Sequence, residues 1–325
     1  MKGPPITAVA VVLGVLFLPF FANAATLSVP GTYGTIQAAV TAAASGDIID
    51  IAAGIYAENV SISGKTNLTI QGAGVTTIVE PVSGMGFALT SCSNVTFTNL
   101  KIHTTGTNAH GIWVAGTPNS GAAMSGLTVQ NTTIIVDGYS AAIYGEQVSP
   151  AHSGWLIGGV GNSNTITINP GTGVTGDGLD LHDVGTSEVS YNTITLNTPT
   201  NSTNVLWTAE LSSLTGLTFA NNTVSGSSGS EVAILTNFIV TTPDVSIATV
   251  SITNNTFSNW GSRALRLGAA NGAGTVTAIT INTNTFNMTS NTEVIGGTAM
   301  DKTGTGNIFN VSPPATIQSA IDSAL

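Results

Sequence analysis

Asn221-Asn222-Thr223-Val224 and Asn254-Asn255-Thr256-Phe257 are two copies of an Asn-Thr-hydrophobic unit that recurs along the chain. Two further copies are Tyr191-Asn192-Thr193-Ile194 and Thr283-Asn284-Thr285-Phe286. The units alternate with apolar strand-like segments, whose spacing of roughly 27 to 31 residues is typical of repeat architectures. A strand-rich unit of this size cannot bury its apolar face alone, but it can when stacked on similar neighbours. The repeat therefore predicts an all-β solenoid.

The first 24 residues predict a signal peptide. Lys2 gives a basic start, residues 6–21 are almost entirely apolar, and Ala22-Asn23-Ala24 is a small-residue cleavage pattern. A membrane anchor is the less favoured alternative, because Pro19 interrupts a run that is already short for a bilayer span. We expect a mature chain that is secreted, periplasmic or on the cell surface, with no membrane span after cleavage.

The composition restricts the classes of partner. Charged residues make up 7% of the chain, and the net charge is -10 with only six Lys and Arg. Such a surface has no basic patch to neutralise phosphates, so nucleic acid is an unexpected partner. A surface of Thr, Ser, Asn and Gly suits sugars, and it equally suits an inert extracellular surface. The single cysteine, Cys92, allows no internal disulfide.

The domain organisation is simple. An amphipathic helix over Thr35–Ala44 is expected to cover the first end of a β-helix domain spanning residues 25–312, because an open strand edge would promote aggregation. After Pro313-Pro314, the segment Ala315–Asp322 nearly repeats the sequence of that helix. Residues 313–325 are therefore either a C-terminal cap helix or the start of a truncated second repeat unit.

Strand alternation predicts which side chains face outward. In the segments beginning at Gly111, Ala142, Gly178 and Ala264, the apolar residues Ile112, Ile143, Leu179 and Leu265 would point into the core. Their neighbours Trp113, Tyr144, Asp180 and Arg266 would then form one outward column, to which Trp207 also belongs. The recurrent Asn222 and its equivalents would point inward at a turn and bond neighbouring coils. Residues 152–173 read as an insertion between coils.

The opening of the mature chain resembles that of pectin-lyase-like right-handed parallel β-helix proteins. The resemblance lies in Gly34-Thr35-Ile36-Gln37-Ala38-Ala39-Val40, Ser45-Gly46-Asp47 and Gly54-Ile55-Tyr56-Ala57-Glu58-Asn59-Val60. With the Asn-Thr-Ile coils, it covers nearly the whole mature chain. It implies a right-handed, single-stranded parallel β-helix of roughly eight to ten coils. The paired Asp motifs of a pectinesterase site are not visible in the sequence.

The densest polar cluster is Asp177-Gly178-Leu179-Asp180-Leu181-His182-Asp183. Alternation places Asp180 and His182 on the same outward face, where a carboxylate can orient an imidazole as acid or base. The segment resembles the Tyr-Gly-Phe-Asp-Pro-His-Asp motif of β-helical alginate C5-epimerases, with Asp177 in the tyrosine position and Leu181 in the proline position. The resemblance implies that Asp180 and His182 handle the proton next to a uronate carboxyl. Tyr144, one coil away, would supply the second proton carrier.

Neighbouring columns suggest how a sugar polymer would be held. Trp113 and Trp207 offer apolar ring faces, Glu146 falls in the column of His182, and Arg266 could bind a carboxylate further along a polymer. We therefore expect Trp113, Trp207, Glu146 and Arg266 to bind the substrate. We expect Asp180, His182 and Tyr144 to be catalytic.

Other interpretations of the same cluster remain open. Asp177, Asp180 and Asp183 could instead hold Ca²⁺, which prefers oxygen ligands, although no cofactor is required by the sequence. The other histidines, His103, His110 and His152, lack metal-ligand spacing and are expected at the surface. Two functions follow: a protein that binds or modifies an acidic polysaccharide by lyase or epimerase chemistry, or a non-catalytic, adhesin-type surface β-helix.

Overall fold

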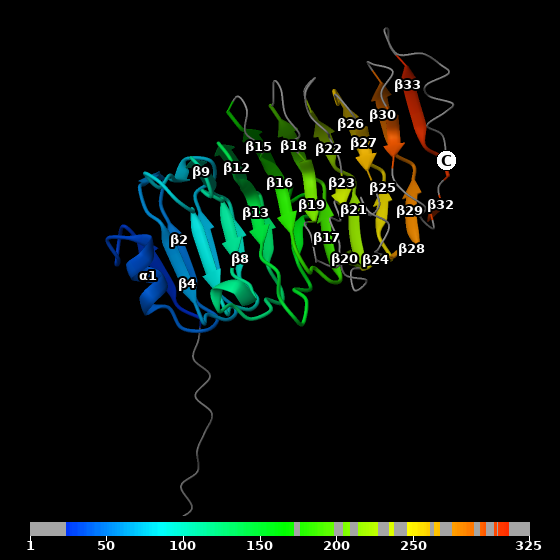
Figure 1. Cartoon of the computed structure of the whole chain (residues 1–325). Coiled ribbons are helices and arrows are strands. Elements are labelled where there is room, and N and C mark those ends of the chain that lie inside the picture. Colours follow the sequence, from blue (N-terminus) through cyan, green and yellow to red (C-terminus); the bar gives the residue numbers. More distant parts are fainter. Residues whose placement is uncertain are drawn as a thin grey trace, which may run out of the picture.

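The computed structural model describes residues 24–171, 176–197, 204–208, 214–226, 234–236, 246–260, 263–266, 275–288, 293–296, 302–303 and 305–311. These residues form a parallel β-helix, in which successive coils contribute 11, 10 and 9 described strands to three long sheets (Figure 1). The predicted fold class is thus confirmed. Residues 1–23 of the predicted signal peptide and the predicted 313–325 segment lie outside the described residues.

The first sheet has 11 strands. In stacking order they are β1 (Thr26–Val29), β2 (Ile48–Ile51), β5 (Thr69–Gly72), β8 (Thr96–Thr98), β11 (Thr128–Gln130), β14 (Leu156–Gly158), β17 (Ser187–Ser190), β21 (Leu217–Ala220), β25 (Ser251–Thr253), β29 (Ile279–Asn282) and β32 (Lys302–Thr303).

The second sheet has 10 strands and follows the first in each coil. They are β3 (Gly54–Tyr56), β6 (Thr77–Val79), β9 (Lys101–Thr105), β12 (Thr133–Asp137), β15 (Thr165–Asn169), β18 (Thr193–Leu196), β22 (Thr223–Ser225), β26 (Thr256–Ser258), β30 (Thr285–Met288) and β33 (Ile308–Val311).

The third sheet has nine strands and carries the candidate site. They are β4 (Val60–Ser63), β7 (Phe87–Thr90), β10 (Ile112–Val114), β13 (Ala141–Gly145), β16 (Asp177–Leu181), β19 (Asn204–Thr208), β23 (Ile234–Thr236), β27 (Arg263–Arg266) and β31 (Glu293–Gly296). A short fourth sheet joins β20 (Leu214–Thr215), β24 (Ser246–Ala248) and β28 (Thr275–Thr277), and a 3₁₀ turn, η1, spans Thr117–Asn119.

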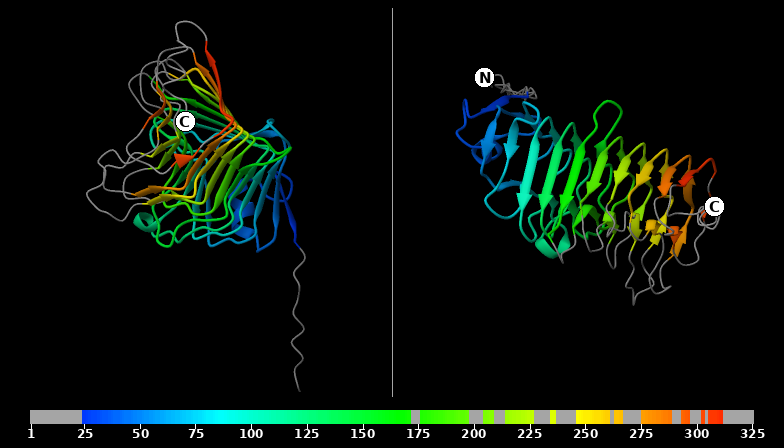
Figure 2. Two further views of the ribbon diagram at one scale, coloured as in Figure 1. Left: turned by 90° about the vertical axis from the view of Figure 1, so that its right-hand side faces the viewer. Right: turned by 90° about the horizontal axis from the view of Figure 1, so that it is seen from above.

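The core is a stack of equivalent apolar side chains. Ile102, Ile134, Ile166 and Ile194 are paired in sequence along the second sheet and are fully buried. Further along, the ring of Phe286 lies 5.3 Å from those of both Phe257 and Phe309. Because each coil covers the next, the strands run side by side along the whole molecule (Figure 2).

The helix α1 (Ile36–Ala42) covers the first end of the stack. Thr35 is its N-cap and accepts a hydrogen bond from the Ala38 amide. The Glu58 carboxylate accepts two more, from the amides of Ile36 and Gln37, and Lys65 donates to the Ala43 carbonyl at the other end. The predicted helix is therefore confirmed, with bounds slightly shorter than Thr35–Ala44.

The recurrent asparagines form a buried ladder at the turn between the first and second sheets. The amide of Asn222 donates to the Asn255 side chain at 3.0 Å and to the Val189 carbonyl at 3.0 Å, and its oxygen accepts from the backbone of Asn192. Side-chain bonds continue the ladder through Asn164, Asn192, Asn222, Asn255, Asn284 and Asn307. From Asn192 onward, the residue preceding the ladder position has a positive φ, as at Asn221 (57°) and Asn254 (58°), a conformation that Asn tolerates well.

The interpretation of residues 152–173 as an insertion is wrong. This segment contains β14 and β15, and Asn164 occupies the ladder position, so it forms a regular part of the stack. Trp155 is 1% exposed and packs in the core. Within the described residues, none of the helices has the length and apolar character needed to cross a membrane.

Candidate functional site

One outward row of the third sheet gathers the candidate residues. Trp113 pairs with Tyr144, and Tyr144 with Asp180, on successive strands β10, β13 and β16. The same row continues through Trp207 on β19 and Leu235 on β23 to Arg266 on β27. The predicted column is therefore confirmed in its backbone register, and it places Arg266 three strands beyond Asp180. The side chains of Trp207 and Arg266 lie outside the described structure.

Asp180 and His182 form a hydrogen-bonded pair. The His182 Nε2 and the Asp180 Oδ1 are 2.9 Å apart, and the two side chains are only 14% and 17% exposed. When Nε2 donates to the carboxylate, Nδ1 is left as the ring nitrogen that can accept a proton. Burial raises the pKa of the Asp180 carboxyl, and the hydrogen bond from His182 opposes this shift.

Tyr144 lies beside two imidazole rings. Its ring centroid is 5.5 Å from that of His182, in an edge-on arrangement, and 4.6 Å from that of His110. Burial raises the pKa of the Tyr144 phenol, and the charges of Asp180 and Glu146 raise it further. The phenol is therefore protonated at neutral pH and can act as a proton donor. The predicted group of Tyr144, Asp180 and His182 is brought together by the fold.

A pocket of about 160 Å³ opens beside Tyr144. Its lining residues come from β13 and β16 and from the turns that lead into β10 and β13: Asn108, His110, Tyr139, Ser140, Ala141, Tyr144, Asp177 and Asp180. Tyr139 is 48% exposed and presents an aromatic surface, as sugar-binding sites commonly do. The lining includes two carboxylates, Asp177 and Asp180, and no lysine or arginine.

A second hollow, of about 280 Å³, lies next along the same sheet. It is lined by residues of β4 and β7 and by the preceding loops, and it shares Asn108 with the first pocket. Ser61 and Ala88, which belong to the row of Trp113 and Tyr144, are part of its lining. The hollowed surface therefore follows the stacking direction across several coils.

His110 is a site residue that sequence reasoning missed. The prediction that it lies at the surface is wrong, because it is 8% exposed. Its Nδ1 accepts a hydrogen bond from the Ala141 amide at 3.0 Å, and burial lowers its pKa to about 4. No periodic signal could have shown this, since His110 lies in a turn before β10 and is covered by the next coil.

His152 was likewise predicted at the surface and is fully buried. Its Nδ1 accepts from the Met124 amide at 2.9 Å, and its Nε2 lies 2.8 Å from the Glu146 carbonyl. Both ring nitrogens are thus used to hold neighbouring loops together. His152 therefore has a structural role.

Glu146 does not face the pocket as a free ligand. It is 8% exposed, and its two carboxylate oxygens accept from the Gly116 amide at 2.9 Å and the Asn119 side chain at 2.6 Å. Its carboxylate holds the loop that contains η1. Its role in substrate binding, which strand alternation suggested, is therefore not favoured by the geometry.

Two other predicted residues have distinct surroundings. Trp113 is half-buried, and its indole Nε1 has no hydrogen-bond partner among the described residues. Asp183 accepts a hydrogen bond from the Val148 amide at 3.3 Å. In the part of the chain that the structure describes, no three His, Cys, Asp or Glu side chains are arranged to hold a metal ion, so Asp177, Asp180 and Asp183 are not assembled as one cluster.

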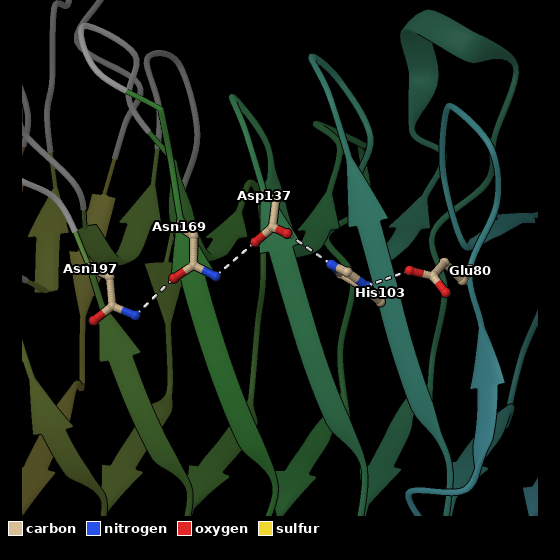
Figure 3. A network of polar contacts seen from close by, with 5 residues as sticks. All are labelled: Glu80, His103, Asp137, Asn169 and Asn197. Atoms are coloured by element: carbon tan, nitrogen blue, oxygen red, sulfur yellow. Dashed lines mark hydrogen bonds and ion pairs between the residues drawn. The ribbon is translucent and has the colours of Figure 1, made fainter.

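A separate polar ladder crosses the outer face of the second sheet (Figure 3). His103 lies between two carboxylates, with Nδ1 2.7 Å from Glu80 and Nε2 2.8 Å from Asp137. Asp137 also accepts from Asn169, which accepts from Asn197. The carboxylates bind opposite sides of the imidazole, so this ladder links coils, and it belongs to a different sheet from the pocket.

Comparison with known proteins supports the fold. No family model and no curated protein matches the chain. Among solved structures, the alginate lyase from Paenibacillus sp. str. FPU-7 is similar with a TM-score of 0.52 and 16% identity, over 90% of this chain and 96% of that one. The PL6 family alginate lyase AlyGC is similar with a TM-score of 0.50 and 15% identity, over 89% of this chain and 40% of that one. At these identities the likeness shows the fold alone, and it confirms the pectin-lyase-like β-helix.

Proposed function

We propose that this chain is an exported protein that binds and modifies an acidic polysaccharide by proton transfer at the carbon next to a uronate carboxyl. The observation that carries the proposal is the contact of the Tyr144 ring with His182, which is itself held by Asp180. An oriented imidazole and a protonated phenol are the acid and base that such chemistry needs. The β-helix likeness to two alginate lyases agrees with this substrate class.

The two residues have different roles. His182, with Nε2 donating to Asp180, accepts the C5 proton at Nδ1. The electrons of the C5–H bond then form a double bond to C4, the C4–O bond breaks, and Tyr144 donates its proton to the leaving oxygen. In the epimerase variant, the C4–O bond stays intact and Tyr144 returns a proton to C5 from the other face. Asp180 orients the imidazole and stabilises its protonated form.

The shape of the surface supports a polymer substrate. The 160 Å³ pocket is smaller than typical ligand pockets, so it suits one sugar residue, and the adjoining 280 Å³ hollow offers a place for its neighbours. Tyr139 at the pocket supplies a surface on which a sugar ring can stack. Trp207 and Arg266 lie further along the row and are proposed to contact the polymer there.

Changing the acid–base pair tests the proposal. Asp180→Asn and His182→Gln should each lower turnover of polymannuronate by about 10² to 10⁴, because each removes a proton-handling group. Both replacements keep the size of the side chain, so the melting temperature should change little. Turnover is measured by the ultraviolet absorbance of the unsaturated product and by the ratio of C5 epimers. Variants that retain full turnover would exclude this assignment of roles.

One observation favours the non-catalytic alternative. The pocket contains two carboxylates and no lysine or arginine, an environment that by itself disfavours an anionic sugar. A surface β-helix that binds neutral glycans would show affinity for a neutral oligosaccharide and no product from any uronate polymer. The same purified chain distinguishes the two functions.

A further inference from the structure

We infer that His110 is a substrate-binding residue of this pocket, which donates a hydrogen bond from Nε2 to the carboxylate of the bound uronate. The inference rests on the proposed function and assigns the group that accommodates the substrate's negative charge. A uronate that loses its C5 proton accumulates further charge on its carboxyl oxygens, so hydrogen-bond donors at that place speed the reaction.

The tautomer of His110 is fixed by the backbone. The Ala141 amide donates to Nδ1 at 3.0 Å, so Nδ1 must be an acceptor and the ring proton must sit on Nε2. The ring contact with Tyr144 on the neighbouring strand holds the imidazole plane. The sequence places Ala141 at the first position of β13, where its amide is available to the preceding coil.

The Nε2–H group of His110 is not engaged by its neighbours in the described part of the chain. His110 is more than nine-tenths buried and lines the pocket, yet its Nε2 makes no hydrogen bond with any residue that the structure describes. His152 offers a direct contrast, because its Nδ1 also accepts from a backbone amide but its Nε2 is bonded to the Glu146 carbonyl. The His110 Nε2 is not among the fully enclosed polar atoms that lack a partner, so it lies at the pocket surface, where a bound acceptor can take the place of solvent.

The pocket needs such a donor. Among the described residues that line it there is no lysine or arginine, so the donors available to a carboxylate are neutral groups such as the His110 imidazole and the Asn108 amide. Burial disfavours a charged imidazole here, and the neutral Nε2–H form persists across the pH range of ordinary assays.

Imidazole NMR on the full chain, with ¹⁵N-labelled histidine, tests the inference directly. The chain has four histidines, so each ring can be assigned by single substitutions. On titration with trimannuronate, the Nε2 signal of His110 should shift and saturate, while the signals of His152 and His103 stay in place. Mannotriose, which lacks the carboxylates, should leave the His110 signal unchanged.

A matched pair of variants separates the donor from the acceptor. In His110→Asn, the side-chain oxygen replaces Nδ1 as acceptor for the Ala141 amide, but the donor at the Nε2 position is lost. In His110→Gln, the side-chain amide replaces Nε2 as donor. We expect at least tenfold weaker trimannuronate binding for His110→Asn, a smaller loss for His110→Gln, and no loss for His103→Gln on the second sheet.

The possible outcomes are distinct. If trimannuronate binds and is turned over while the His110 signal and the His110→Asn affinity match the parent, the inference is overturned and the proposed function stands. If mannotriose shifts the His110 signal and no uronate binds, both the carboxylate assignment and the proposed function are overturned. An imidazole that titrates at its ordinary pKa, near 6.5, would also contradict a neutral donor.

Discussion

At the scale of single residues, the molecule depends on side chains that bond the coil on either side. Asn222 is 1% exposed, and its side chain makes four hydrogen bonds with residues of neighbouring coils. Each ladder asparagine satisfies backbone groups that the turn would otherwise leave unpaired, which explains why the same residue type recurs in this place. The sequence predicted this role from the repeat alone.

Replacing a ladder residue should therefore destabilise the fold. Asn222→Ala should lower the free energy of unfolding by about 1 to 3 kcal/mol, because it leaves buried donors and acceptors without partners. Chemical denaturation measures this change. Asn197→Ala is the matched control, since Asn197 is exposed and makes one side-chain bond to Asn169, and it should cost less than about 0.5 kcal/mol. Equal stability of Asn222→Ala and the parent would contradict the buried ladder.

Single residues also show where sequence reasoning fails. Alternation correctly placed Tyr144 and Asp180 in one row, because it depends only on strand periodicity. It could not show that Glu146 is buried under the loop of Gly116 and Asn119, nor that His110 and His152 are buried in turns. Burial of a turn depends on the neighbouring coil, which lies about thirty residues away in sequence.

At the scale of elements, the outer face of the second sheet carries its own stabilising contacts. The ladder of Glu80, His103, Asp137, Asn169 and Asn197 links five successive strands of this sheet, β6, β9, β12, β15 and β18, with Glu80 and Asn197 directly after the first and the last of them (Figure 3). Burial pushes the pKa of Asp137 upward. The hydrogen bonds from His103 and Asn169, with the charges of His103 and Lys101, outweigh this effect and lower the pKa. Its ionised form is thus favoured by folding.

This shift predicts how the ladder responds to acid. A carboxyl whose pKa is lowered in the folded state adds stability above its unfolded pKa, about 3.9, and the contribution is lost as the pH falls through the folded pKa. Asp137→Asn should be less stable than the parent by under about 1 kcal/mol at pH 7, since Asp137 is partly solvent-exposed. The difference in the free energy of unfolding between Asp137→Asn and the parent should be smaller at about pH 3. Asn197→Ala changes no titrating group, so its effect should be the same at both pH values, and a pH-independent Asp137→Asn effect would contradict the assignment.

At the scale of the whole molecule, the parallel stack has an end that must be covered. Helix α1 buries Ile36, Ala39 and Val40 against the first coils, and Glu58 holds its first turn. The sequence predicted the fold and this cap, because both arise from local patterns that repeat or that match a known opening segment. The prediction of an insertion at residues 152–173 is wrong, because Asn164 is a ladder residue.

Loosening the cap should expose the end of the stack. Glu58→Ala removes two hydrogen bonds from the N-terminus of α1 and should cost about 0.5 to 2 kcal/mol of stability. It should also increase self-association, because exposed strand edges pair with other chains. Thermal unfolding and light scattering measure the two effects, with Glu58→Gln, which keeps an acceptor, as the milder control. An unchanged melting temperature and a monodisperse Glu58→Ala would show that Glu58 is not needed for the cap.

The central claim is that the row on the third sheet removes and returns a proton at C5 of a uronate. Incubating polymannuronate with the protein in D₂O, followed by NMR of the sugar, tests this for lyase and epimerase chemistry together. The account predicts either deuterium at C5 or an unsaturated C4–C5 product, both reduced about 10² to 10⁴-fold in Tyr144→Phe, which removes the phenol and keeps the ring. Polymer recovered with its C5 protons intact, or equal exchange by Tyr144→Phe and the parent, would contradict it.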